Sequence, residues 1–206
     1  MGYHRAGFDE IVGVDNRPQP RYPFEFVKAD AQEYVAEHGR EFDAIHASPE
    51  CQGYSKLAVM HKERGYALLI GQVRDTLIEV GLPYAIENVE TAPMVTQPSL
   101  DGRWGAYLCG SMFGLGCRGD EYLRRHRIFE TTFPVAQLNC RHRGRHAIGV
   151  YGHGGVSGKH RMAYRAEAAE AMGIDWMNRD EMCQAIPPAY TEYIGRELIK
   201  HLGFAA

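Results

Sequence analysis

The first half of the chain alternates short apolar segments with helix-like ones, and this alternation limits the possible folds more than any other feature. Four apolar segments are typical of buried strands, at residues 10–15, 24–29, 42–47 and 83–86. Helical patterns lie between them, over residues 31–37 and 66–80. Strands that alternate with helices predict a parallel α/β sheet.

Reactive side chains follow the ends of these predicted strands. Asp15, Asp30, Cys51 and Glu87 each lie at or just beyond such an end. Ligands of open parallel sheets bind beyond the carboxyl ends of the strands. The sequence therefore predicts a site at that edge of the sheet, formed by these four side chains.

The region from residue 96 to 165 is rich in glycine and basic residues and has little periodicity. It predicts a small irregular lobe, followed by helices over 163–172 and 191–202. We expect three regions: a core over residues 1–130, a lobe over 131–175, and a segment over 176–206 that returns to the core.

Charge is distributed unevenly along the chain. The net charge is −3, but residues 118–165 hold ten Lys and Arg against three acidic residues. That stretch carries +7, so the rest carries −10. A basic segment on an acidic body favours a polyanionic partner, the alternative being a solvated basic face.

Composition fits one sizeable core, with 206 residues of which 45% are hydrophobic. Neither a membrane-spanning apolar run nor the apolar core of a signal peptide is visible. The odd count of 5 cysteines favours free thiols in a reducing compartment. We expect a monomeric, cytoplasmic protein without membrane association.

Four residues are candidates for a catalytic role. Cys51 lies in a loop after a predicted strand, where a thiol can act as a nucleophile, although a lone cysteine is more often a small buried hydrophobe. Glu87 could donate or accept a proton if burial raises its pKa. Arg125 and Arg127 are two residues apart, so in an extended segment both would point the same way.

Four motifs, taken together, resemble those of a known family. They are Ser-Pro-Glu-Cys-Gln at 48–52, Glu-Asn-Val at 87–89, Arg-His-Arg-Ile-Phe at 125–129 and Gln-Ala-Ile-Pro-Pro at 184–188. Their order and spacing are similar to the DNA (cytosine-5)-methyltransferases, and most similar to the small, phage-encoded members. The resemblance spans residues 2–203 and implies a Rossmann-like methyltransferase sheet that uses S-adenosylmethionine, with a small target-recognition lobe.

The resemblance also implies a mechanism. The target cytosine leaves the DNA stack, and the Cys51 thiolate adds to ring carbon 6. Glu87 pairs with ring nitrogen 3 and the exocyclic amine, while Arg127 and Arg125 steady the base. Carbon 5 then receives a methyl group from S-adenosylmethionine, after which loss of its hydrogen expels the thiol.

Binding residues follow from the same resemblance. Asp15 matches the acid that binds the cofactor ribose, Asp30 matches the one that contacts the adenine amine, and Pro49 and Gln184 complete the cofactor set. Double-stranded DNA is the implied partner, and no metal is assigned. The residues expected to contact DNA are Gln52, Arg141, Arg143, Arg145 and Lys159.

The chain departs from the family pattern in three places. It begins with what resembles the helix after the Gly-rich cofactor turn, so we expect the first strand and that turn to be missing and the sheet to have a gap. Glu50 replaces the proline before Cys51 and should raise the pKa of the thiol. Leu123 replaces a glutamine before the arginine pair. We expect impaired methyl transfer, weak or absent.

Two alternatives remain open from the sequence. One is a catalytically inactive DNA-binding remnant of such an enzyme. The other is a zinc-binding module, with Cys109, Cys117, Cys140 and His142 as ligands. Their spacing lacks the Cys-x-x-Cys pair that is typical of zinc knuckles.

Overall fold

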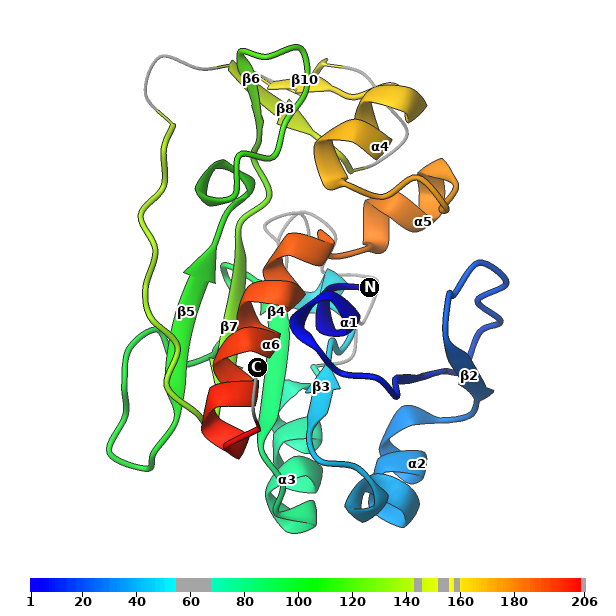
Figure 1. The fold of residues 1–206 in the computed structure, drawn as a ribbon, viewed down its shortest axis with the longest axis vertical. Helices are drawn as coiled ribbons and strands as arrows, with labels where there is room; N and C mark the ends of the chain where they lie inside the picture. Colours follow the sequence, from blue (N-terminus) through cyan, green and yellow to red (C-terminus); the bar gives the residue numbers. More distant parts are fainter. Residues whose placement is uncertain (55–67, 143–145, 152–155, 158–159, 205–206) are drawn as a thin grey trace.

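The central sheet has four strands, in the order β3-β4-β7-β5 (Figure 1). The computed structural model describes residues 1–54, 68–142, 146–151, 156–157 and 160–204. The strands of this main sheet are β3 (Ile45–Ala47), β4 (Tyr84–Val89), β5 (Trp104–Leu108) and β7 (Arg127–Thr131). β3 runs parallel to β4, whereas β7 runs antiparallel to both β4 and β5. β4 is central, which explains why its first five residues are buried.

Helices cover both faces of the main sheet (Figure 1). On one face α3 (Ile70–Val80) packs Ile70 and Leu77 against Tyr84 and Ile86 of β4. On the other, α6 (Pro188–Leu202) packs its apolar residues against Phe129 of β7. The α/β class expected from the sequence is therefore confirmed. In the described part of the chain, no helix is both long and apolar enough to cross a membrane.

The short helix α1 (Gly2–Ala6) lies directly against α6. A Cβ added to Gly2 would be 2.3 Å from the Pro188 carbonyl oxygen, and one added to Gly195 would be 2.8 Å from the Cβ of Ala6. Two glycines thus permit the close approach of these helices. This contact places Tyr3 near the main sheet, where it joins the apolar cluster under α6.

A second, parallel pair of strands is formed by β1 (Val12–Asp15) and β2 (Glu25–Lys28), followed by α2 (Ala31–His38). Among the described residues this pair has no hydrogen-bonded register with the main sheet. A cavity of about 480 Å³ lies between the two, lined by β1 residues and by residues 44–49 around β3. The separation agrees with the gap predicted for a sheet that lacks a central strand.

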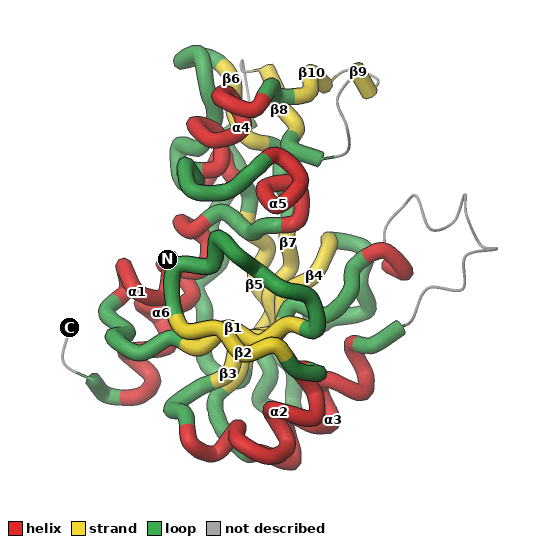
Figure 2. Tube along the Cα trace, turned by 90° about the vertical axis from the view of Figure 1, so that its right-hand side faces the viewer, coloured by secondary structure: helices red, strands yellow, loops and turns green. Residues whose placement is uncertain are grey.

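A separate lobe is built on the second four-stranded sheet, in the order β6-β8-β10-β9 (Figure 2). Its elements are β6 (Glu121–Leu123), β8 (His146–Gly149), β9 (Val156–Ser157), β10 (His160–Met162), α4 (Arg165–Met172) and α5 (Arg179–Gln184). α4 and α5 pack on it through one apolar cluster that includes Leu123, Ile148, Met172 and Met182. The lobe is therefore less irregular than expected. Its sheet also takes β6 from before residue 131, and its cluster takes α5 from after residue 175.

Element boundaries match the sequence best where an apolar run is long. The predicted helix over 163–172 is observed as α4, which ends at Gly173 in the left-handed conformation. The predicted helix over 66–80 is observed as α3, which begins at Ile70, later than predicted, since Leu68 and Leu69 are not helical; residues 66 and 67 lie outside the described residues. β4 extends to Val89, three residues beyond the predicted strand, so Glu87 lies inside the strand and not after it. α5 was not predicted.

Candidate active site

Cys51, Glu87 and Arg127 come from three neighbouring parts of the main sheet. In the β4–β7 register Glu87 lies opposite Phe129 and Arg127 opposite Val89. These positions are diagonal neighbours on one face, because side chains two residues apart on a strand point the same way. Arg127 Nε lies 2.7 Å from Glu87 Oε1. Cys51 lies in the loop after β3, which pairs with β4 on its other side.

Burial controls the protonation of Glu87, which is 6% exposed. Loss of hydration raises the pKa of its carboxyl above the ordinary value, while Arg127, Arg125 and a hydrogen bond with Ser48 act in the opposite direction. The net shift is upward. Glu87 therefore keeps its proton to a higher pH than an exposed glutamate, which is typical of a carboxyl group that can act as a general acid.

Cys51 is half-buried, and its pKa is raised first by burial. Arg127 and Arg125 favour the thiolate, whereas Glu50 and Glu87 oppose it. The expected effect of Glu50 on the thiol is confirmed in direction. The net shift keeps the thiol protonated to a higher pH, and the charge of Arg127 is the largest influence that favours the thiolate.

Asn88 holds the loop that carries Cys51. Its side chain is fully buried, and its Nδ2 donates a 2.9 Å hydrogen bond to the carbonyl of Pro49. A second hydrogen bond, from the Tyr54 amide to the Cys51 carbonyl, closes the loop at 3.1 Å. Asn88 belongs to the Glu-Asn-Val motif, but no feature of the sequence indicates that it holds this loop. A fully buried amide within a strand requires such a partner.

Arg125 takes different hydrogen-bond partners from Arg127, although the charges of both arginines act on Cys51 and Glu87. Its guanidinium is buried and donates to three backbone carbonyls, those of Val150 at 2.6 Å, Cys183 at 2.7 Å and Ala185 at 2.8 Å. It thereby joins the main sheet to the lobe and to the segment that leads into α6. Arg125 therefore connects these parts of the structure, and its charge also lowers the pKa of Glu87.

A hydrogen-bonded chain that the sequence did not reveal leads from α1 to Glu87. The Tyr3 hydroxyl lies 2.8 Å from His46 Nδ1, and His46 Nε2 lies 3.0 Å from Ser48 Oγ. Ser48 in turn bonds to Glu87. Burial lowers the pKa of His46 to about 4, so its ring is neutral near pH 7. If Tyr3 donates to Nδ1, the proton on Nε2 is directed at Ser48.

The cavity beside β1 contains two of the four residues expected to bind the cofactor. Asp15 and Pro49 both line it. The Asp15 carboxylate accepts hydrogen bonds from the Arg17 amide at 2.7 Å and from Gln19 Nε2 at 3.2 Å. A carboxylate has about four acceptor positions, so Asp15 can still accept from a ligand hydroxyl.

The other two expected cofactor residues lie elsewhere. Asp30 is exposed and caps α2, where its carboxylate accepts from the amides of Gln32 and Glu33 at 2.9 and 3.1 Å. Gln184 is the exposed last residue of α5. Neither lines the cavity. The structure thus brings Asp15 and Pro49 together. Asp30 does not line the cavity but lies beside it, because Ala31 and Gln32 line it and the Ala29 amide donates to the Asp15 carbonyl at 3.2 Å, whereas Gln184 ends α5.

The predicted DNA contacts are described only in part. Gln52 is exposed in the short 3-10 helix η2 (Gln52–Tyr54), immediately after Cys51. Arg141 is exposed, and its amide donates to Ser111 Oγ at 3.1 Å. The remaining three, Arg143, Arg145 and Lys159, lie outside the described residues.

Comparison with known proteins adds little to this geometry. No protein-family model matches the chain, and no curated protein is similar enough to match. Among solved structures, the chain is similar to a triply substituted DNMT2 from Spodoptera frugiperda, with 18% identity and a TM-score of 0.42. The match covers 72% of this chain and 51% of that one, so this chain spans about half the length of its structural neighbour. A likeness of this size assigns no activity.

Proposed function

We propose that this protein transfers a methyl group from S-adenosylmethionine to carbon 5 of cytosine in DNA. The observation that carries the proposal is the buried Glu87–Arg127 pair beside Cys51. It combines a thiol, a carboxyl group with a raised pKa and a cation at one end of the sheet. The sequence motifs that contain these residues resemble the DNA (cytosine-5)-methyltransferases.

The proposed reaction begins when the Cys51 thiolate adds to ring carbon 6 of a cytosine that has left the DNA stack. The electron pair displaced from the ring double bond makes carbon 5 nucleophilic, and Glu87 donates its proton to ring nitrogen 3. Carbon 5 would then form a bond to the methyl group that the cofactor sulfonium supplies, while the methyl–sulfur bond breaks and a neutral thioether leaves. Solvent water takes the proton from carbon 5, which restores the ring double bond and expels the Cys51 thiolate, and nitrogen 3 returns its proton to Glu87.

Arg127 has two opposing effects in the proposed reaction. It favours the thiolate of Cys51, which promotes the attack, and it favours the charged form of Glu87, which opposes protonation. Burial of Glu87 outweighs the second effect, because the net pKa shift of the carboxyl is upward. The same guanidinium can therefore assist the nucleophile without removing the acid.

The cavity beside β1 fits the nucleoside part of S-adenosylmethionine. Its volume of about 480 Å³ lies in the range of small-molecule sites, and its walls are largely apolar, with the Tyr22 ring among them. Asp15 offers an acceptor for ribose hydroxyls, and Pro49 connects the cavity to the loop of Cys51. The bound cofactor would supply the electrophilic methyl group.

The basic stretch over residues 118–165 supports DNA as the molecule that contains the target cytosine. The stretch carries +7 by sequence, and among its described residues Arg141 is exposed, whereas Arg118 and Arg161 pair with Glu167. Phosphate contacts of this kind make affinity fall steeply with salt concentration. The lobe elements β6, β8 and β10 lie beyond the end of the main sheet at which β7 begins, as Figure 1 shows.

One observation favours the second candidate, a DNA-binding protein with little or no catalysis. Burial and Glu50 both raise the pKa of Cys51, so few molecules carry the thiolate near pH 7. We therefore propose that chemistry is slow in this chain. Glu50→Gln removes the negative charge beside Cys51, and Glu50→Pro also restores the proline typical of the family. If both variants react faster than the unmodified protein, the site is catalytic but slow; if neither reacts, the protein binds DNA without catalysis.

The test is a single-turnover methyl-transfer assay with protein in excess over a pool of random-sequence duplexes, using cofactor with a radioactive methyl group. We expect slow formation of 5-methylcytosine that is lost in Cys51→Ser and Glu87→Gln and kept in Cys183→Ser, the matched cysteine control. Product in the Cys51→Ser variant, or none in the Glu50 variants while DNA binding is retained, would contradict the proposal.

A further inference from the structure

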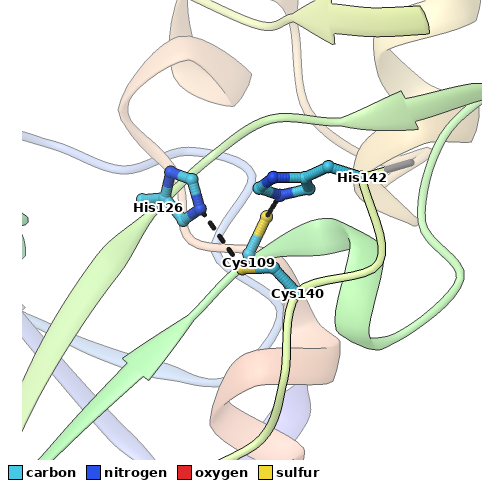
Figure 3. A group of neighbouring side chains, drawn as sticks. All are labelled: Cys109, His126, Cys140 and His142. Atoms are coloured by element: carbon cyan, nitrogen blue, oxygen red, sulfur yellow. Dashed lines mark hydrogen bonds between the residues drawn. The ribbon is translucent and has the colours of Figure 1, made fainter. Parts of the chain in front are cut away.

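Four side chains able to bind a metal converge beside the candidate active site, as Figure 3 shows. They are Cys109, His126, Cys140 and His142, and their ligand atoms all lie within 4.8 Å of one another. Cys109 is buried, the two histidines are half-buried, and Cys140 is exposed. None of the four takes part in the proposed methyl transfer.

Three separate segments supply these side chains. Cys109 follows the last residue of β5, and His126 immediately precedes β7. Cys140 and His142 come from the extended chain that follows β7 and runs back toward the lobe (Figure 1). Since the three segments are distant in sequence, their side chains meet only through the fold, and a bridging ion would join them into one unit.

Two sulfur–nitrogen separations in the group are close to those that one shared tetrahedral ion would impose, while the ligand atoms as a whole lie within 4.8 Å of one another, so the widest pairs would have to close in on a bound ion. His142 Nε2 lies 3.3 Å from Cys109 Sγ, and His126 Nε2 lies 3.5 Å from Cys140 Sγ. Bonds of about 2.3 Å to sulfur and about 2.0 Å to nitrogen, at tetrahedral angles, separate sulfur from nitrogen by roughly 3.5 Å. In both contacts the nitrogen is Nε2, so both rings direct the same atom at the centre of the group.

Neighbouring groups hold the ligands in position. His126 Nδ1 faces Glu90 Oε2 at 3.5 Å, and a carboxylate behind the second ring nitrogen orients the imidazole of zinc-bound histidines. The Tyr122 ring stacks on His142 with centroids 4.8 Å apart. Ser111 Oγ donates to Cys109 Sγ at 3.4 Å, as hydroxyl groups commonly do to a metal-bound thiolate.

We propose that Cys109, His126, Cys140 and His142 bind one zinc ion. Two thiolates and two imidazoles form a complete tetrahedral set, which leaves no open position for substrate and therefore indicates a structural ion. His126 lies between Arg125 and Arg127, so the ion would fix the backbone that carries both arginines. The site holds β5, the start of β7 and the chain around Cys140 together.

The ligand set differs from the zinc alternative considered from the sequence, in which Cys117 took the place of His126. Cys117 Sγ donates to Glu121 Oε2 at 3.0 Å and packs in the apolar cluster of the lobe. It does not belong to the group of four. Cys117→Ser is therefore a matched control for Cys140→Ser.

The test uses the full chain, purified from cells grown with added zinc and without chelators. Elemental analysis should give about one zinc per chain in the unmodified protein and in Cys117→Ser. Cys140→Ser and His142→Ala should lose most of it. Circular dichroism of each variant shows whether it is folded, so that loss of metal is not confused with loss of structure.

A spectroscopic measurement on the unmodified protein does not depend on any variant. After exchange with Co²⁺, we expect the intense visible bands of a tetrahedral ion together with thiolate-to-cobalt charge-transfer absorption. X-ray absorption of the zinc form should show two sulfur and two nitrogen neighbours. A folded protein that holds less than a tenth of a zinc ion per chain and takes up no Co²⁺ would overturn the proposal, as would equal zinc loss in Cys117→Ser and Cys140→Ser.

Discussion

Replacement of Arg127 by glutamine tests whether the Glu87–Arg127 pair acts as the structure indicates. The two side chains are 16% and 7% exposed and 2.7 Å apart. Removal of one partner from a buried ion pair costs about 3–5 kcal/mol, and the residual exposure of Arg127 favours the lower end. At alkaline pH, where Glu87 would be charged without a partner, we expect Arg127→Gln to lower the free energy of unfolding by about 3 kcal/mol.

The loss of stability in Arg127→Gln should increase as pH rises. Arg127 lowers the pKa of Glu87 in the folded protein, so its removal raises that pKa further. The folded variant then binds a proton over a wider pH range, and its stability relative to the unmodified protein falls as pH rises. As pH falls and Glu87 becomes protonated in the variant, the loss of stability should shrink, because a neutral carboxyl no longer needs the charge of Arg127.

Urea unfolding at several pH values between about 5 and 9 measures both effects. Arg141→Gln, which removes an exposed arginine, is the control and should change stability by less than about 0.5 kcal/mol at every pH. When Arg127→Gln is added to Glu87→Gln, the further loss of unfolding free energy should be the same at all pH values, because no carboxyl group remains to titrate. If the loss of unfolding free energy in Arg127→Gln is constant across this pH range, or grows as pH falls, then Glu87 is not the titrating partner and the assignment is refuted.

Three further outcomes follow from the structure. Glu50→Gln should lower the pKa of Cys51 and speed its alkylation by iodoacetamide a few-fold near pH 7, as followed by peptide mass spectrometry; an unchanged rate would mean that Glu50 has no influence on the thiol. Because burial holds the pKa of His46 at about 4, below its unfolded value of 6.5, the free energy of unfolding should decline by roughly 3 kcal/mol as pH falls through that window. His46→Gln should remove this part of the pH dependence. Arg74→Ala should destabilise the protein in thermal or urea unfolding, since Arg74 donates to both carboxylate oxygens of the fully buried Glu130 at 2.6 and 3.0 Å; the cost should stay below the roughly 3 kcal/mol of an unpaired buried charge, because Arg103 Nη1 still lies 3.2 Å from Glu130 Oε1.

The strands of the first half could be predicted because each is an apolar run that ends at a polar residue. The same rule placed Glu87 outside β4, since a carboxylate inside a buried strand is costly without a partner. The partner is Arg127, which lies forty residues further along the chain and meets Glu87 only through the β4–β7 register. Local patterns carry no information about such pairing.

The lobe was harder to predict for a related reason. Its sheet pairs β6 with β8 and β8 with β10, so each strand depends on another that is distant in sequence. α5 is short and polar, but a signal for it was present, because Asn178 and Glu181 form a reciprocal capping box at its start. For the metal ligands, the alternative considered from the sequence included Cys117, although the spacing lacks a Cys-x-x-Cys pair, whereas the fold brings His126 to the group.

Covalent trapping tests the central claim, attack by Cys51 on cytosine, most directly. The protein is incubated with S-adenosylmethionine and random-sequence duplexes that contain 5-fluorocytosine, whose fluorine cannot leave as a proton does, so the thiol is not expelled. The account predicts an adduct that survives denaturation, maps to Cys51 by peptide mass spectrometry and is missing in Cys51→Ser. A folded, DNA-binding protein that forms no adduct even as Glu50→Pro, or an adduct on another cysteine, would contradict it.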